Sequence, residues 1–280
     1  MNTISQRIGF MQGRLSPLID GKIQAFPWPW WQQEFHAASQ LGLHLMEWTI
    51  DQNRLHENPL MTPEGQEEIR GLCKQFDLTL PSLTGDCFMQ APFWKAEGQA
   101  RASLETDFVA IVRACAAVGI KMIVVPLVDN GRLDSAVQEN TLVEYLQAQS
   151  ALLSELGVQV LFESDFSPRE LARFIGRLDP DRFGINYDIG NSAALGFNPA
   201  EEFDAYGSRI LNVHVKDRVL GGTTVPLATG NADFPTVFAL LRAHGYQGNY
   251  IMQTARASDE RHSETLKTYM RQIEAWGSGG

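Results

Sequence analysis

The sequence has few cysteines, no long apolar run and an excess of acidic over basic residues. Its three cysteines, Cys73, Cys87 and Cys115, are an odd number at unrelated spacings, a pattern typical of buried thiols in a reducing cytoplasm. No apolar run approaches the ~20 residues that a helix needs to span a bilayer, and no basic segment followed by an apolar one opens the chain. We therefore predict a cytoplasmic protein without an export signal or a membrane anchor.

The balance of charged residues limits the partners that this protein can have. Aspartate and glutamate number 33, lysine and arginine number 23, and the formal net charge is -10. A surface of this sign repels nucleic-acid phosphates and anionic lipids, so neither nucleic acid nor a membrane is expected as a partner. The composition, with 44% apolar and 20% charged residues, is typical of a folded globular protein.

A short pattern recurs along the chain, in which an amphipathic helix ends at a turn residue and an apolar strand follows at once. Glycine holds the turn position in three copies, and Asp77 holds it in a less regular fourth copy. The copies are SQLGLHLMEW (39–48), KQFDLTLPSL (74–83), AAVGIKMIVV (116–125) and SELGVQVLFE (154–163). The glycines stand where the end of a helix requires a positive φ.

Extending this alternation predicts strands at 6–12, 43–49, 78–83, 120–127, 158–163, 183–188, 209–215 and 249–254. Helices are expected between them at 30–41, 62–76, 97–118, 136–156, 168–178, 199–206, 234–244 and 259–276. Strict alternation implies parallel strands, and eight such units favour a closed barrel. We therefore predict an α/β fold, a single (β/α)8 TIM barrel over residues 1–276, with a flexible tail at 277–280. A doubly wound sheet is the alternative, but the first strand–helix connection lacks the GxGxxG motif.

Polar side chains end four of the predicted strands: Glu163, Asp188, His214 and Gln253. Active sites of such barrels lie at the carboxyl ends of the strands, so these side chains are expected to converge. Two carboxylates, an imidazole and an amide oxygen make a site for a divalent cation such as Mn²⁺, Mg²⁺, Co²⁺ or Zn²⁺. Each residue taken alone is better explained as a capping or hydrogen-bonded group at a strand end, but four equivalent positions on consecutive strands reverse this preference and favour the metal site.

The order of these motifs resembles that of the xylose isomerase-like superfamily of sugar phosphate isomerases and epimerases. The resemblance covers essentially the whole chain and rests on LFESD (161–165), YDIGNS (187–192), NVHVKDR (212–218), TGNADF (229–234) and HGYQGNYIMQTAR (244–256). It implies a xylose isomerase-like TIM barrel whose metal ligands are Glu163, Asp188, His214 and Gln253. The superfamily also contains dehydratases and DNA-repair endonucleases, so the fold does not choose the reaction.

Two residues depart from the pattern of the epimerases that the chain resembles. Gln253 stands where these enzymes usually have an acid–base glutamate, and Asn191 stands where histidine often follows Asp-x-Gly. Glu163 is therefore expected to act as the principal base, moving a proton next to a carbonyl. Lys216 is the candidate for a second proton carrier or for steadying the enediolate oxygen, unless it forms a plain ion pair with Asp217.

Further residues are candidates for binding the substrate. Arginine forks suit phosphate or carboxylate groups, and Glu47 can accept hydrogen bonds from sugar hydroxyls. The substrate-binding candidates are Arg14, Glu47, Asn191, Arg218 and Arg256. For Glu47 and the arginines, the alternative is a structural ion pair.

Taken together, these residues predict a metal-dependent isomerase or epimerase that acts on a small sugar or sugar phosphate through an enediolate. A catalytically altered sugar-binding TIM barrel is an alternative, suggested by Gln253 and Asn191. An AP-endonuclease-like phosphodiesterase would need several metal ions, many histidines and a basic face, which the net charge of -10 does not favour. The oligomeric state is left open by the sequence.

Overall fold

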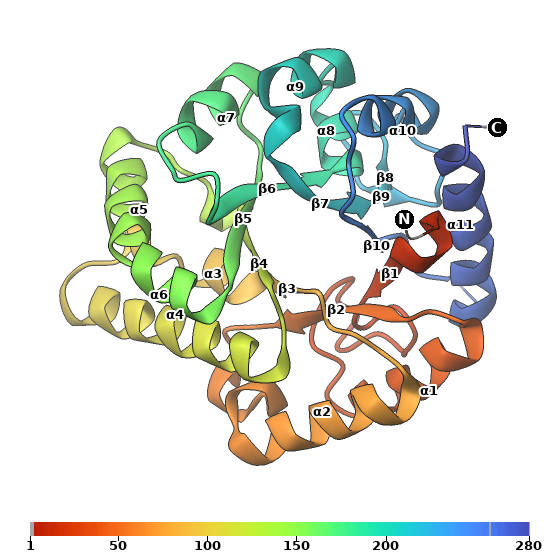
Figure 1. Cartoon of the computed structure of the whole chain (residues 1–280), viewed down its shortest axis with the longest axis horizontal. Coiled ribbons are helices and arrows are strands. Elements are labelled where there is room, and N and C mark those ends of the chain that lie inside the picture. Colours follow the sequence, from red (N-terminus) through yellow and green to blue (C-terminus); the bar gives the residue numbers. More distant parts are fainter. Residues whose placement is uncertain (1–2, 258, 280) are drawn as a thin grey trace.

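The computed structural model describes residues 3–257 and 259–279, and its parallel strands close into a barrel (Figure 1). Strands β1 to β7 follow one another around the barrel, and β10 lies between β7 and β1. The barrel strands are β1 (Ile8–Met11), β2 (Leu45–Ile50), β3 (Ser82–Gly85), β4 (Met122–Leu127), β5 (Gln159–Ser164), β6 (Phe183–Asp188), β7 (Ile210–Val215) and β10 (Asn249–Met252). The predicted (β/α)8 TIM barrel is confirmed.

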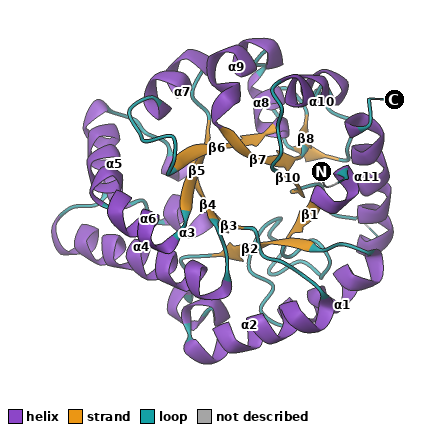
Figure 2. Ribbon diagram, viewed as in Figure 1, coloured by secondary structure: helices purple, strands orange, loops and turns teal. Residues whose placement is uncertain are grey.

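Helices surround the barrel on its outside (Figure 2). They are α1 (Trp31–Leu41), α2 (Pro63–Phe76), α4 (Gly98–Val118), α5 (Ala136–Ala148), α6 (Ser150–Leu156), α7 (Pro168–Ile175), α9 (Pro199–Tyr206), α10 (Phe234–Ala243) and α11 (His262–Gly277). Two short helices, α3 (Asp86–Gln90) and α8 (Ile189–Leu195), directly follow β3 and β6. Strands β8 (Asp217–Arg218) and β9 (Thr224–Val225) form a small antiparallel ribbon after β7.

The structure corrects several predicted boundaries. The third strand lies at Ser82–Gly85 instead of 78–83, because Pro81 has no N–H to donate to a ladder. The predicted helix at 136–156 is two helices that separate at Gln149. Helix α11 includes Gly277, so the predicted tail begins one residue too early, and Gly280 lies outside the described residues.

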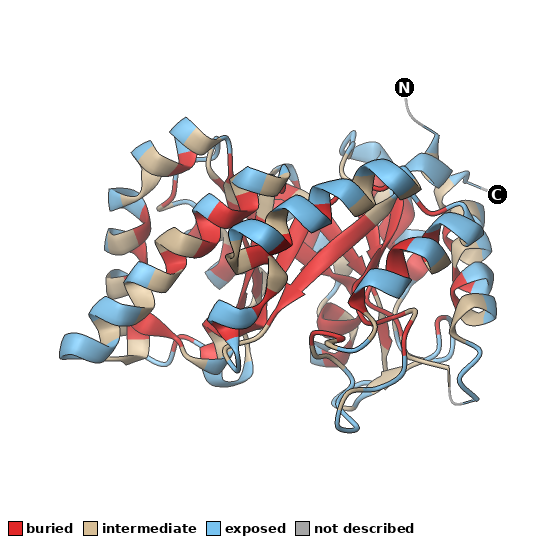
Figure 3. Ribbon diagram, turned by 90° about the horizontal axis from the view of Figure 1, so that it is seen from below, coloured by how far each residue is buried: buried red, intermediate tan, exposed pale blue. Residues whose placement is uncertain are grey.

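The interior of the molecule has an apolar layer outside the barrel and a polar group of side chains inside it. In β7, Val213 and Val215 belong to the apolar core, whereas Asn212 and His214 reach Glu47 across the barrel. Figure 3 shows buried residues along the strands and the inner faces of the helices, with exposed residues on the outer faces. Within the described residues, no helix has both the length and the apolar character needed to cross a membrane.

Gly9 in β1 provides a test of the barrel packing. An added Cβ there would lie 2.8 Å from Ile251 Cδ1 and 2.8 Å from Leu45 Cβ, on the two neighbouring strands. We predict that Gly9→Ala lowers the free energy of unfolding by about 1–3 kcal/mol, because the closed barrel cannot expand locally. Urea denaturation measures this change.

Gly71, an exposed residue in α2, is the matched control because an added Cβ there meets no atom within 4 Å. Gly71→Ala should raise the free energy of unfolding by about 0.5–1 kcal/mol, since alanine favours the helix. Equal stability of the Gly9→Ala variant and the unaltered protein would contradict the tight packing described here.

Candidate active site

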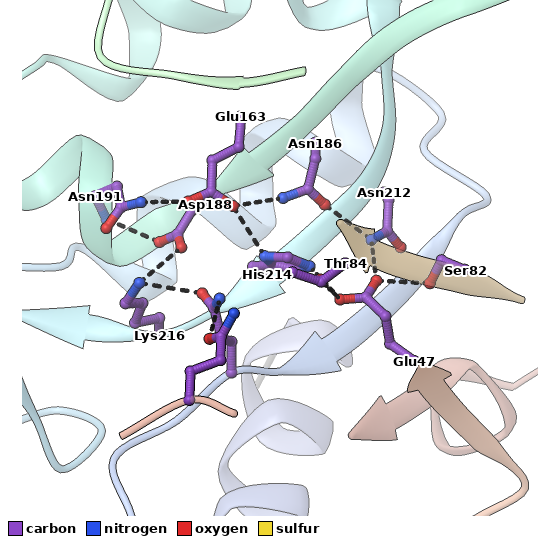
Figure 4. A network of polar contacts seen from close by, with 12 residues as sticks. Glu47, Ser82, Thr84, Glu163, Asn186, Asp188, Asn191, Asn212, His214 and Lys216 are labelled. Carbon is purple, nitrogen blue, oxygen red and sulfur yellow. Dashed lines mark hydrogen bonds and ion pairs between the residues drawn. The ribbon is translucent and has the colours of Figure 1, made fainter. Parts of the chain in front are cut away.

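Three buried side chains meet at the carboxyl ends of β5, β6 and β7 (Figure 4). Glu163, Asp188 and His214 each offer a ligand atom, and these atoms all lie within 4.8 Å of one another. Asp188 and His214 are register partners in the β6–β7 ladder, which places them side by side. Two carboxylates and one imidazole are suitable ligands for a divalent cation, so the donor set fits such an ion.

His214 is held between two carboxylates. Its Nε2 lies 2.7 Å from Glu47 Oε1, and its Nδ1 lies 3.1 Å from Glu163 Oε2. Burial alone would lower the pKa of His214, but the charges of Glu47 and Glu163 raise it to about 10. Burial alone would likewise raise the pKa of Glu163, but the hydrogen bond with His214 holds it below its usual value. Glu163 is therefore a carboxylate at neutral pH.

Glu47 lies inside the barrel and not at its mouth. It is completely buried, and its oxygens accept hydrogen bonds from Ser82 Oγ at 2.6 Å and Thr84 Oγ1 at 2.5 Å. Together with the contact to His214, these bonds occupy both oxygens, and Glu47 is absent from the lining of the mouth cavity. Its position indicates a role in fixing the imidazole, which differs from the predicted contact with sugar hydroxyls.

Lys216 links Asp188 to Gln253. Its Nζ donates to Asp188 Oδ2 at 3.1 Å and to Gln253 Oε1 at 3.1 Å, so its partner is Asp188 and not Asp217. Asp188 also caps α8, because its Oδ1 accepts the backbone N–H of Asn191 at 2.8 Å. A cation bound by both Asp188 and Gln253 would therefore share these acceptor oxygens with the Lys216 ammonium group.

Glu163 is oriented by two amides. Asn186 Nδ2 donates to Oε2 at 3.1 Å, and Asn191 Nδ2 donates to Oε1 at 2.5 Å. Arg218 in turn donates from Nη1 to Asn191 Oδ1 at 2.8 Å and uses Nε and Nη2 on the carbonyl of Gly222. Asn191 and Arg218 thus support the orientation of the Glu163 carboxylate.

A cavity of about 390 Å³ opens above these side chains at the mouth of the barrel. Five of the predicted site residues line it, namely Glu163, Asn191, Lys216, Arg218 and Gln253. It also contains polar residues that sequence reasoning missed: Gln24, Asp86, Arg132 and Asp165.

Arg14 and Arg256 do not line this cavity. Arg14 is buried and donates to the carbonyls of Thr254 at 3.0 Å and Ile23 at 3.2 Å, and burial lowers its pKa to about 10. Arg256 donates from Nη2 to the carbonyl of Ser16. Both guanidinium groups therefore tie mouth loops together, and the prediction that they receive a substrate anion has no support in this geometry.

Asp86 was missed because the third strand was predicted to end too early. With the strand ending at Gly85, Asp86 is the first residue after it and stands at the mouth like Glu163 and Asp188 on their strands. The sequence signal that could have identified Asp86 is its position as a polar residue directly after the true end of the strand. Gln24 belongs to the long segment between β1 and α1, where no periodic pattern predicts which side chains turn inward.

The fold and the site together define a class of protein, the parallel (β/α)8 barrels with carboxylate and imidazole groups at the carboxyl ends of their strands. The family model described as xylose isomerase-like TIM barrel matches residues 35–274. The chain belongs to this family, as the sequence motifs predict.

Individual relatives are distant. An inosose dehydratase from Geobacillus kaustophilus (strain HTA426) is 25% identical over 148 residues, covering 45% of this chain and 48% of the relative. The chain thus spans about half the length of the curated relatives it matches. A D-psicose 3-epimerase solved in the presence of D-fructose shares the fold with a TM-score of 0.76 at 13% identity, covering 98% of this chain and 100% of the other.

A further structure with the same fold is a xylose isomerase-like TIM barrel protein from Mycobacterium smegmatis in complex with magnesium. Its TM-score is 0.70 at 15% identity, and the match covers 100% of this chain and 99% of the other. Proteins similar to this chain therefore include a dehydratase, an epimerase and a metal-bound barrel.

Asp217 anchors the segment that carries Arg218 to the mouth. Its carboxylate is completely buried and accepts the backbone N–H groups of Thr229 at 3.1 Å, Gly230 at 2.8 Å and Ala232 at 3.1 Å. Both oxygens are needed as acceptors, so the side chain closes the loop between β7 and α10.

We predict that Asp217→Asn lowers the free energy of unfolding by about 1–3 kcal/mol, because an amide NH₂ would face backbone N–H groups and leave a buried donor unpaired. Urea denaturation followed by fluorescence measures the loss. Asp204→Asn, at an exposed position in α9, is the control and should stay within about 0.5 kcal/mol. Equal effects of the two substitutions would rule out the anchoring role.

Proposed function

We propose that this protein is a divalent-metal-dependent sugar isomerase or epimerase that removes a proton next to a carbonyl group and proceeds through an enediolate. The observation that carries this proposal is the meeting of Glu163, Asp188 and His214 within 4.8 Å of one another, with Glu163 lining the cavity. The names of the similar proteins, an inosose dehydratase and a D-psicose 3-epimerase, support a polyhydroxylated substrate.

Glu163 is the base in this proposal. It lines the cavity as a carboxylate, and Asn186 and Asn191 hold its two oxygens in a fixed orientation. Such a positioned carboxylate can take a proton from a carbon next to a carbonyl and return it to the neighbouring carbon. Lys216, which also lines the cavity, can steady the oxygen that becomes negative.

Glu163, Asp188 and His214 would hold the cation. Gln253 would be the fourth ligand through its amide oxygen, which shares the Lys216 ammonium with Asp188. When bound, Mn²⁺, Mg²⁺, Co²⁺ or Zn²⁺ supplies Lewis-acid polarisation of the substrate carbonyl. Glu47 would fix the orientation of the His214 ring from inside the barrel. Its contact with Nε2 leaves Nδ1 of His214 directed toward Glu163.

The charges around the cavity favour an unphosphorylated substrate. Each of its three cationic side chains is already engaged: Arg132 pairs with Asp165 at 2.5 Å, Arg218 donates to Gly222 and Asn191, and Lys216 bonds Asp188 and Gln253. Among the described residues that line the cavity, none is a cation left over for a phosphate group. Of the two substrate classes that the sequence predicts, a neutral sugar or keto-polyol therefore fits this lining better than a sugar phosphate.

Solvent exchange tests the function. Incubation in deuterium oxide with Mn²⁺ and unphosphorylated ketoses, D-fructose, D-psicose, D-tagatose and an inosose, should place deuterium next to the carbonyl of at least one of them, measured by mass spectrometry. Glu163→Gln should lower the exchange rate by about 100-fold or more, because the amide cannot accept the proton. Glu155→Gln, at an exposed position in α6, should exchange at the unaltered rate. Binding without exchange would instead identify a sugar-binding protein.

Gln253 has a separable role in this proposal. Gln253→Ala should weaken Mn²⁺ binding about tenfold, measured by isothermal titration calorimetry, and added Mn²⁺ should restore much of the lost exchange, because the amide supplies a ligand atom and no proton. Gln247→Ala, at an exposed position after α10, is the control. Loss of exchange that saturating Mn²⁺ leaves unrestored would show that Gln253 acts in the chemistry itself.

A further inference from the structure

We propose that Asp86 is a second acid–base residue, which moves the oxygen-bound proton of the substrate while Glu163 moves the carbon-bound proton. This inference rests on the proposed function and makes it more specific. A reaction that needs both kinds of proton transfer is the interconversion of an aldose and a ketose, whereas epimerisation next to a carbonyl moves only the carbon-bound proton. The substrate class is therefore an uncharged α-hydroxy aldehyde or ketone.

Asp86 occupies the cavity with one oxygen held and the other available. Gln24 Nε2 donates to Asp86 Oδ2 at 2.6 Å, and Gln24 Oε1 accepts from Gln253 Nε2 at 3.0 Å. Gln24 thus orients Asp86 relative to the proposed metal ligand. Oδ1 accepts no hydrogen bond from the residues that the structure describes, although the side chain lines the cavity. A substrate hydroxyl is the partner that this oxygen lacks.

The surroundings of Asp86 keep its proton exchangeable near neutral pH. Burial is the main cause, and together with the carboxylates of Asp51 and Glu163 it outweighs the hydrogen bond from Gln24 and the charge of Arg14, raising the pKa of Asp86 to about 7. Asp51 follows β2, Arg14 follows β1, and Glu163 lies in β5, so carboxylates face Asp86 from two strands. A group that titrates near the working pH can both donate and accept a proton.

The proposed step balances in protons and electrons. Glu163 takes the proton from C2 of an aldose, the C–H pair forms the C1=C2 bond, and the carbonyl oxygen O1 takes a proton from Asp86. Asp86 then accepts the proton of the O2 hydroxyl, the pair left on O2 forms the new carbonyl, and C1 takes the proton back from Glu163. Both carboxyl groups end in their starting states, and no oxidant or co-reactant is needed.

Asp86→Asn tests whether Asp86 moves the oxygen-bound proton while Glu163 moves the carbon-bound proton. Asparagine keeps an oxygen for the hydrogen bond from Gln24 but cannot carry the proton. In deuterium oxide, with Mn²⁺ and the ketose of the panel that exchanges with the unaltered protein, conversion to the aldose should fall about 100-fold. Exchange into recovered ketose should fall much less, so the ratio of exchange to conversion should rise at least tenfold. Asp129→Asn removes another carboxylate from the same cavity lining and should leave the ratio unchanged.

The outcomes distinguish this inference from the proposed function. Equal losses of exchange and conversion would indicate a structural role for Asp86, and an unchanged ratio at full activity would show that it carries no proton; either result overturns the inference while the proposed function stands. Absence of exchange by the unaltered protein with every ketose would overturn both.

A measurement without substrate checks the ionisation. The raised pKa means that the unfolded state loses this proton near pH 4 and the folded state near pH 7, so stability from this group falls as the pH rises between these values. The melting temperature of Asp86→Asn minus that of the unaltered protein, both free of added metal, should therefore become more positive from pH 5 to pH 8. A difference that stays constant over this range would show that Asp86 ionises normally, which contradicts its role.

Discussion

The contact between His214 and Glu47 in the barrel interior is the interaction on which the site depends. Both side chains are completely buried, and Nε2 lies 2.7 Å from Oε1. A buried ion pair is tolerated only when its remaining hydrogen-bonding atoms are satisfied, and loss of one partner typically costs about 3–5 kcal/mol. Ser82, Thr84 and Asn212 satisfy the oxygens of Glu47, so these neighbours on β3 and β7 complete the support below the site.

The same interior network continues to Glu163, the proposed base. Asn212 Nδ2 donates both to Glu47 and to Asn186 Oδ1, and Asn186 Nδ2 donates to Glu163. Two amides therefore connect the carboxylate inside the barrel to the carboxylate in the cavity. Because an amide has a donor and an acceptor at fixed positions, this series of hydrogen bonds sets the orientation of Glu163 without adding charge. The proposed base, Glu163, is thus oriented by side chains on barrel strands, and sites built on strands are held more precisely than sites on loops.

The fold and much of the candidate site could be predicted because they follow from local patterns. Apolar runs predict the strands, and the polar residues at the strand ends predict that Glu163, Asp188 and His214 converge, as they do in the structure. The same reasoning failed where a strand boundary was wrong. With the third strand predicted at 78–83, Asp86 lay three residues beyond the predicted strand end, whereas in the structure it directly follows the strand. An arginine side chain can bind a substrate anion or a backbone carbonyl, and its residue type does not distinguish the two. That Arg14 donates to the carbonyls of Thr254 and Ile23 could be learned only from the folded loops.

The formal charge of the buried cluster is consistent with the divalent cation that we propose for it. Three acidic side chains, Glu47, Glu163 and Asp188, face two basic ones, His214 and Lys216, which leaves one formal negative charge uncompensated when all five are ionised. Metal ligation by His214 would require its neutral imidazole, so a bound divalent cation would bring two positive charges while one proton leaves, and the cluster would become neutral. Because uncompensated buried charge is costly, neutrality favours binding. Replacing Gln253 by a carboxylate would return the cluster to a negative charge, so the amide at this position matches a site in which Lys216 remains charged.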